Sequence, residues 1–251
     1  MSIKLNKYQI EKFSRQIVLK DIGVLGQKKI IKAKVLIVGM GGLGCPAAEY
    51  LTRAGIGSLG IIDSDNVDLS NIHRQSLFNS EDLKKSKVLA AKKKLKKINP
   101  KTDIDCYKIK LNKKNCLNII KKYDFVIDGS DNFETKFLIN DFCKKFKKFL
   151  VTGAISKFDG HIFTFNFKDK KTPCLQCFYQ SMPSDEILNC EAEGIMGPVA
   201  GIIGNIQANE SLKQILKVGQ DLKNNILIIN LLTLNFRKVF FKKRKKCLCK
   251  N

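Results

Sequence analysis

The stretch Lys34-Val35-Leu36-Ile37-Val38-Gly39-Met40-Gly41-Gly42-Leu43-Gly44 decides the fold. Its first five residues are typical of a buried strand, and the pattern G-x-G-x-x-G follows at once and leads into a helical segment that extends to about Arg53. Glycines let the backbone turn tightly and approach a phosphate, and the free N–H groups at the start of a helix attract an anion. The stretch therefore predicts a strand, a phosphate-binding loop and a helix.

An acidic residue ends the second predicted strand, the position at which a nucleotide-binding βαβ unit carries one. Segment 58–63 is predicted to be the second strand, and Asp63 ends it, 19 residues after Gly44. A carboxylate at this place accepts a hydrogen bond from a ribose hydroxyl. Nucleotide binding is therefore favoured over a tight turn without a ligand. The pattern alone does not identify the nucleotide, and NAD is its usual occupant.

Short apolar segments alternate with helical ones after this unit. We expect strands at 103–110, 123–128 and 149–155 and helices at 80–98, 113–121 and 133–147. Such alternation predicts right-handed βαβ units and a parallel sheet. After residue 157 the pattern changes to a strand at 161–167, a Pro- and Cys-containing loop at 173–193, a helix at 197–218 and a hairpin of strands 225–231 and 235–241.

These elements predict an α/β fold that is Rossmann-like and doubly wound. The sheet is mainly parallel with an antiparallel C-terminal extension, and two N-terminal helices, 7–19 and 22–32, precede it. No linker or repeat interrupts the pattern, so we expect a single domain over 1–251, with a nucleotide-binding half at about 1–155.

Composition excludes several classes of protein. The content of 44% hydrophobic and 27% charged residues is that of a folded globular chain. The longest uncharged segment, Gly194 to Asn209, is shorter than the ~20 apolar residues that cross a bilayer. The N-terminal residues lack the apolar core of an export signal, so we expect a cytoplasmic protein with no membrane association.

The net charge of +23 does not by itself indicate a nucleic-acid-binding protein. Only five of the 46 basic residues are Arg, the residue that nucleic-acid interfaces favour, and the lysines are spread over solvated helix faces. We therefore expect no nucleic-acid partner, although a basic nucleic-acid-binding protein is the non-enzymatic alternative.

Four charged residues around the glycine loop favour ATP over NAD. Arg74 follows the second strand, Lys87 lies in the next helical segment, Asp131 follows strand 123–128, and Arg15 lies in the first helix. Cations offset the charge that develops on a leaving pyrophosphate, and a carboxylate can hold Mg²⁺. An NAD-dependent oxidoreductase would need an acid–base group instead, and it is the alternative enzyme.

Taken together, these motifs resemble the ThiF/MoeB/HesA family, the bacterial relatives of ubiquitin-activating enzymes. The resemblance runs from about residue 8 to the C-terminal tail. It rests on Ser14-Arg15-Gln16, Gly39–Gly44, Asp63, Ser70-Asn71-x-x-Arg74-Gln75, Lys87, Asp131-Asn132, Cys174-x-x-Cys177 and Gly197-Pro198.

The resemblance implies ATP-dependent adenylation of the C-terminal glycine carboxylate of a ubiquitin-like sulfur-carrier protein, with release of pyrophosphate. Arg15, Arg74 and Lys87 would contact phosphates and Asp131 would position Mg²⁺. Arg74 would reach into the site of a neighbouring subunit, which implies a homodimer. The second half of the chain, about 156–251, would bind the carrier and zinc. The remaining nucleotide contacts would be Gly42, Asp63, Ser70, Asn71 and Asn132.

Five of the nine cysteines lie outside apolar or helical patterns. The resemblance implies that Cys174 and Cys177 hold a structural Zn²⁺ together with two cysteines of the tail. Here the tail has Cys247-Leu248-Cys249, one residue short of the usual C-x-x-C, so a reduced pair without metal is the alternative.

Cys190 is the fifth of these cysteines, and the resemblance places it in a crossover loop above the adenylate. It would link covalently to the carrier. The alternative is that it takes no part, because Glu191 and Glu193 do not favour a thiolate and adenylation needs no protein nucleophile.

The pathway stays open between thiamine-type and molybdopterin-type carriers, with the thiamine type slightly favoured by the segment 187–201. No rhodanese-like segment follows in the 251 residues, so we expect a separate sulfur donor.

Overall fold

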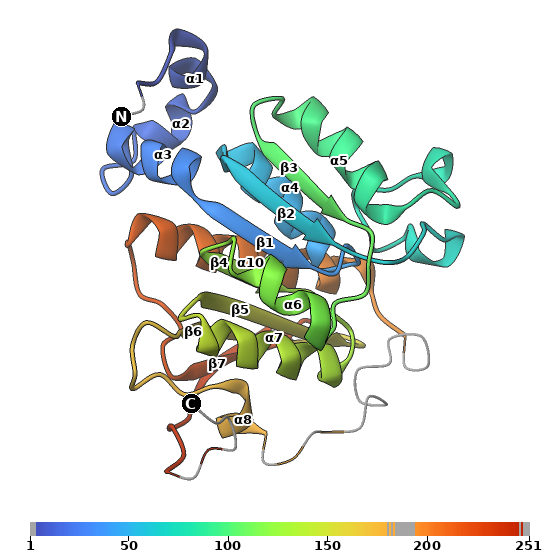
Figure 1. Cartoon of the computed structure of the whole chain (residues 1–251), viewed down its shortest axis with the longest axis vertical. Helices are drawn as coiled ribbons and strands as arrows, with labels where there is room; N and C mark the ends of the chain where they lie inside the picture. Colours follow the sequence, from blue (N-terminus) through green and yellow to red (C-terminus); the bar gives the residue numbers. More distant parts are fainter. Residues whose placement is uncertain (1–3, 180, 182, 184–193, 246, 248–251) are drawn as a thin grey trace.

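A sheet of eight strands forms the centre of the computed structural model, which describes residues 4–179, 181, 183, 194–245 and 247 (Figure 1). The strand order is β3-β2-β1-β4-β5-β6-β7-β8; β1 to β5 are parallel, and β6 to β8 pair antiparallel. The mainly parallel sheet with an antiparallel extension is thus confirmed. The strands are β1 Lys34–Val38, β2 Ser58–Ile62, β3 Asp103–Tyr107, β4 Phe125–Asp128, β5 Phe149–Ser156, β6 Asp159–Asn166, β7 Asn225–Asn230 and β8 Asn235–Phe240.

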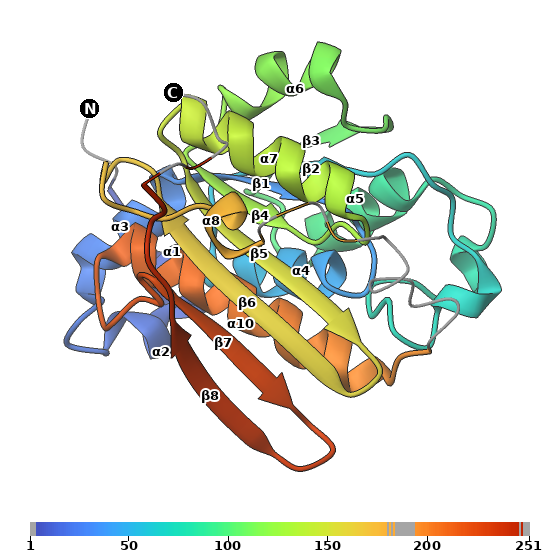
Figure 2. The ribbon, with the colours of Figure 1, turned by 90° about the horizontal axis from the view of Figure 1, so that it is seen from below.

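Helices cover both faces of the sheet, as a doubly wound fold requires (Figure 2). The β1 side chains of Val35, Leu36 and Ile37 are fully buried because they pack alternately against the two layers. One layer contains α3 (Gly23–Lys32), α4 (Gly44–Ala54), α5 (Lys87–Ile98) and α10 (Gly197–Leu216). The other contains α6 (Lys113–Ile120), α7 (Phe133–Lys145) and α8 (Leu175–Phe178), the last within the expected loop 173–193.

Three helices, rather than the expected two, precede β1. The expected helix 7–19 divides into α1 (Lys7–Lys12) and α2 (Ser14–Ile17) at Phe13, where ψ is 12°. The Phe13 ring is buried and lies so close to Gly55 that a Cβ there would be 2.5 Å from Phe13 Cζ. Burial of this ring therefore outweighs continuation of the helix.

The expected helix 80–98 is wrong over its first seven residues. Residues Ser80–Asp82 form a 3-10 turn, Lys84 has a φ of +64°, and α5 begins only at Lys87. The backbone of Val67 explains the difference, because it donates to Lys85 O and accepts from Lys84 N. This long-range pairing uses backbone groups that a helix would have used.

Strand β3 is three residues shorter than expected. It ends at Tyr107, whose carbonyl accepts a hydrogen bond from Asp63 N at 3.2 Å, and residues 109–111 then cross the ends of the parallel strands. The helix expected at 197–218 ends at Leu216 because Lys217 is left-handed. Within the described part of the chain, no helix combines the length and the apolar character that crossing a membrane requires.

Candidate functional site

A cavity of about 690 Å³ lies at the carboxyl ends of β1, β2 and β4. This is the edge of an open α/β sheet at which ligands bind, and the volume is in the range of nucleotide-sized ligands. Most of the residues expected at the nucleotide line it: Gly39, Gly41, Gly42, Asp63, Asn71, Arg74, Lys87, Asp131 and Asn132. Three others, Arg15, Gly44 and Ser70, do not line it.

The glycine loop is shaped by close backbone contacts. Gly39 has a φ of +90°, which disfavours any residue with a side chain. Gly44 begins α4 beneath the loop, where a Cβ would lie 1.8 Å from Gly39 O. At Gly42 a Cβ would lie 2.9 Å from the Cβ of Ala200 on α10. The absence of a side chain at Gly44 thus allows the loop to close on the start of α4.

Asp63 follows β2 and lies in the cavity wall. Its Oδ2 accepts a hydrogen bond from Met40 N and its Oδ1 accepts one from Asp65 N, both at 2.8 Å. Burial raises the pKa of Asp63 above its ordinary value, while Lys87 and the two backbone N–H groups act in the opposite direction. Each carboxylate oxygen retains a lone pair that can accept a ligand hydroxyl.

Arg74 lies in the cavity of its own chain. Its guanidinium donates to Ser70 O at 3.0 Å and to Asn71 Oδ1 at 2.7 Å, and both partners lie in the preceding 3-10 turn, Leu69–Asn71. This places Arg74 at the cavity of its own chain, and its expected contact with the site of a neighbouring subunit stays a prediction. The Ser70 hydroxyl bonds instead to Asp68 Oδ1, which caps the turn.

Lys87 is the first residue of α5 and is largely buried. Its Nζ lies 3.0 Å from Oδ2 of Asp65, so the cation faces the cavity with one carboxylate beside it. Asp65 stands in the polar segment after β2. It was not among the expected site residues, although it follows a parallel strand as Asp63 does.

The loop after β4 carries Asp131 and Asn132. Asp131 is exposed to the cavity and accepts a hydrogen bond from Asn132 Nδ2 at 3.1 Å. Asn132 Oδ1 accepts from Thr135 N at 2.8 Å and caps α7. Asp131 is therefore a carboxylate available for a cation, whereas Asn132 mainly fixes the helix start.

Arg15 is exposed on α2 and is not part of this cavity. The N-terminal helices and the turn after α2 also carry exposed apolar side chains, namely Tyr8, Ile10, Val18, Leu19 and Leu25. The structure therefore does not bring Arg15 together with Arg74 and Lys87 in one chain.

Apolar residues complete the cavity and were not expected there. Ile109 and Leu111 enter from the segment after β3, and Ala154 and Ile155 from the end of β5. Ligands bind beyond the carboxyl ends of parallel strands, and this rule could have located Ile109 and Leu111 as it located Asp63. The expected strand 103–110 was too long, however, so that Ile109 was placed inside the strand rather than beyond its end.

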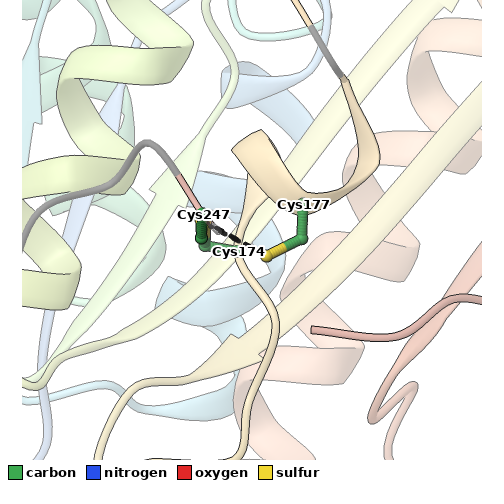
Figure 3. A group of neighbouring side chains, drawn as sticks. All are labelled: Cys174, Cys177 and Cys247. Atoms are coloured by element: carbon green, nitrogen blue, oxygen red, sulfur yellow. Dashed lines mark hydrogen bonds between the residues drawn. The ribbon is translucent and has the colours of Figure 1, made fainter. Parts of the chain in front are cut away.

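Three cysteine sulfurs meet outside the cavity (Figure 3). Cys174 immediately precedes α8 and Cys177 lies within it. Their Sγ atoms are 3.7 Å apart, and Cys247 Sγ is 3.4 Å from Cys174 Sγ and 3.5 Å from Cys177 Sγ. A tetrahedral Zn–S distance of about 2.3 Å would place sulfurs about 3.8 Å apart. The three side chains therefore have the donor type and spacing of a thiolate metal site.

The thiol of Cys177 is held by several donors. Burial raises the pKa of Cys177. Hydrogen bonds from the backbone N–H groups of Arg244 and Cys174, together with hydrogen bonding between Cys177 and the two neighbouring thiols, outweigh this and bring the pKa below its ordinary value. A lowered pKa favours the thiolate that metals bind. Cys249 and Cys190 lie outside the described residues.

Comparison with known proteins now identifies the family. The family model described as "ThiF family" matches residues 13–251. The chain belongs to the ThiF family. A sulfur carrier protein adenylyltransferase of Thermus thermophilus is 35% identical over 98% of this chain and 92% of its own length. The adenylyltransferase and sulfurtransferase MOCS3 of Drosophila virilis is 42% identical over 97% of this chain, which spans 54% of that protein.

Solved structures agree on the architecture of this ThiF-family chain. The E. coli MccB structure with MccA-N7isoASN superposes with a TM-score of 0.84 at 22% identity, covering 98% of this chain and 76% of that one. PaaA gives a TM-score of 0.79 at 21% identity, with coverages of 97% and 77%. These likenesses confirm the doubly wound fold.

Proposed function

We propose that this protein adenylates the C-terminal glycine carboxylate of a ubiquitin-like sulfur carrier, using ATP and releasing pyrophosphate. The observation that carries the proposal is one cavity that holds a glycine loop at a helix N-terminus, the cations Arg74 and Lys87, and the carboxylate Asp131. The two relatives named as adenylyltransferases, each of which matches nearly the whole of this chain, support it.

The nucleotide fits this cavity in one orientation. Ile109 and Leu111 offer an apolar wall to the adenine, and Asp63 accepts from the ribose hydroxyls. The triphosphate then lies over the glycine loop toward Arg74 and Lys87, where the N-terminus of α4 adds a favourable dipole. Asp131 has the oxygen ligands that Mg²⁺ prefers, and a bound Mg²⁺ would offset phosphate charge.

The reaction requires positioning rather than a protein nucleophile. The carrier carboxylate attacks the α-phosphorus, a new P–O bond forms, and the bond to pyrophosphate breaks, leaving an acyl-adenylate. No proton is transferred in this step. Arg74 and Lys87 stabilise the charge that develops on the leaving pyrophosphate, an effect worth several kcal/mol (about 3–4 for one well-placed donor).

The two halves of the chain divide the work in this proposal. Residues about 1–155 bind the nucleotide, and about 156–251 bind the carrier and a structural Zn²⁺. Cys174, Cys177 and Cys247 supply three thiolates with suitable spacing, and Cys249 is the fourth ligand that we propose. Closed thiolate sites of this kind stabilise the fold and take no part in catalysis.

A second copy of the chain completes the site. The exposed apolar side chains of the N-terminal segment that carries Arg15, including Val18, Leu19 and Leu25, are suited to burial in a homodimer. In such a dimer Arg15 contacts the phosphates in the partner's cavity, because it does not reach its own. The sulfur comes from a separate donor, and a thiamine-type carrier is favoured over a molybdopterin-type one.

Carrier-dependent ATP–pyrophosphate exchange tests this function. Asp131→Asn should lower the exchange rate by about 10²-fold or more, because a neutral amide would hold the Mg²⁺ that offsets developing phosphate charge less well than the carboxylate does. The matched control is Glu134→Gln, an exposed carboxylate three residues later that does not line the cavity. ATP, and not NAD, should raise the melting temperature. Normal exchange in Asp131→Asn would remove Asp131 from its role, and stabilisation by NAD alone would favour an oxidoreductase.

Cys190 is tested separately, because adenylation does not require it. Cys190→Ser should keep the exchange rate, and only the wild type should form a carrier adduct that a reducing agent cleaves. Normal exchange with no adduct in either protein would show that Cys190 takes no part. Loss of exchange in the variant would contradict a role confined to the covalent step.

A further inference from the structure

A buried ion pair lies directly beneath the cavity. Asp128, the last residue of β4, is fully buried, and Lys136 on α7 is 3% exposed. Lys136 Nζ is 3.3 Å from Asp128 Oδ2 and donates to Gly153 O on β5 at 2.6 Å. Neither side chain lines the cavity, so neither contacts the nucleotide directly.

The pair nevertheless holds both segments that do line the cavity. Asp128 Oδ1 accepts hydrogen bonds from the backbone N–H and the hydroxyl of Ser130, at 2.9 Å and 2.6 Å. Ser130 belongs to the loop 129–132 that carries Asp131. On the other side, Gly153 immediately precedes Ala154 and Ile155 in the cavity wall. Thr152 on β5 also donates to Asp128 Oδ2.

A second contact fixes the same strand ends from the opposite face of the sheet. Gln207 on α10 is fully buried, and its Nε2 donates to Asp128 O at 2.8 Å. A Cβ at Gly153 would lie 2.8 Å from the Gln207 amide, so β5 and α10 approach closely at this point. The ends of β4 and β5 are thus held between α7 and α10.

Stability alone does not account for the ion pair. Removing two charges from water is costly, and apolar replacements of buried pairs are often neutral or stabilising. A rigid support for a site is a role that apolar side chains do not reproduce, because they cannot bridge a carboxylate and a carbonyl.

We propose that Lys136 is a positioning residue for adenylation: by bridging Asp128 and Gly153 O, its ammonium group holds loop 129–132 and the end of β5 in the arrangement that places Asp131 at the phosphates. This inference rests on the proposed function. It assigns no contact between Lys136 and the substrate.

Lys136→Met tests the proposal, with Lys145→Met on the exposed side of the same helix as the matched control. In Lys136→Met, kcat for carrier-dependent exchange should fall by about 10²-fold, the scale of a 1 Å misplacement. The dissociation constant for AMP should change little, because Asp63 and the glycine loop are untouched. Lys136→Arg should recover much of kcat, because it restores a cation at the same place.

A double variant separates positioning from folding. Asp128→Asn with Lys136→Met removes both charges, so its melting temperature should return to or exceed the wild-type value while kcat stays low. It also remains informative if Lys136→Met alone does not fold. Full kcat in the double variant would overturn the proposal, because the pair would then serve stability only.

Amide hydrogen exchange at Ser130 gives a readout that needs no activity. The Ser130 N–H should lose protection in Lys136→Met and keep it in Lys145→Met. Unchanged protection together with unchanged kcat would refute the positioning role. Absence of exchange activity in the wild type with every carrier would refute the proposed function instead, and the Ser130 measurement would still decide on Lys136.

Discussion

The parallel and antiparallel halves of the sheet differ in how they are covered. The strand residues of β1, β2 and β4 are largely buried between helix layers, and their carboxyl ends meet at the cavity. All six residues of β8 are exposed, including Phe236 and Phe240, and β8 is an edge strand (Figure 2). Buried strand ends hold charged groups in fixed places, whereas an exposed edge is open to pairing with another chain. The cavity therefore lies on the part of the sheet that helices cover on both faces.

The largest difference in stability is expected between alanine substitutions at two glycines, one in the crowded glycine loop and one on an open helix surface. Gly44→Ala should prevent folding or lower the free energy of unfolding by more than about 3 kcal/mol, because its Cβ would overlap Gly39 O, a backbone atom. At Gly201 on α10 an added Cβ would meet no atom within 4 Å. Because alanine favours a helix more than glycine does, Gly201→Ala should raise the free energy of unfolding by about 0.5–1 kcal/mol. Urea denaturation measures both. A folded Gly44→Ala of normal stability would contradict the loop geometry.

Two phenylalanines compare the covered and exposed parts of the antiparallel half. Phe165 on β6 is fully buried and stacks between Phe163 and Phe167. Phe165→Ala should cost about 3–5 kcal/mol. Phe240→Ala, at a position that is 58% exposed, should stay within about 0.5 kcal/mol of the wild type. A large loss in Phe240→Ala would mean that β8 is covered in solution by another chain.

Local patterns predicted the parallel half well. The strand, the glycine loop and Asp63 are neighbours in sequence or follow the strand-end rule, so their positions in the cavity could be anticipated. Long-range contacts decided the rest. The start of α5 depends on pairing with Val67, and the break at Phe13 depends on packing against Gly55, neither of which a local pattern contains.

The site shows the same limit. The residue type of Arg74 predicted a phosphate contact, but only the structure shows that hydrogen bonds to the turn Leu69–Asn71 hold its guanidinium at the cavity of its own chain. Lys136 carries no local signal, because a lysine on a helix is ordinarily a solvated charge. Its role follows from Gly153 on a strand 17 residues away.

Removal of metal should have an intermediate effect, confined to the antiparallel half. Cys174→Ser should abolish zinc binding and lower the free energy of unfolding by about 2.7 kcal/mol when free zinc is a hundredfold above its dissociation constant. Cys106→Ser, at a cysteine outside the cluster, should retain the metal. Elemental analysis and thermal denaturation check both. Metal-free wild-type protein with unchanged stability would mean that the cluster is a reduced group of thiols.

The smallest expected effect is a pH dependence that originates at His161 on β6. Burial lowers the pKa of His161 below its ordinary value of 6.5; Asp159 acts in the opposite direction, and Arg237 lowers it further. The unfolded chain therefore binds a proton at a higher pH than the folded one does. The stability that neutral His161 contributes is complete above pH 6.5 and is lost as the pH falls through the lowered folded value.

The free energy of unfolding should accordingly decline between pH 7 and pH 5, and His161→Gln should make this decline shallower. Arg237→Gln should also reduce it, because removing the positive charge brings the folded pKa closer to the unfolded one. The contribution of Asp63 to the pH dependence of stability has the opposite sign. Burial raises the pKa of Asp63, so the folded protein binds this proton more readily than the unfolded chain and acidification favours the folded state. Urea denaturation at a series of pH values separates the two groups, and a slope that His161→Gln leaves unchanged would place its origin elsewhere.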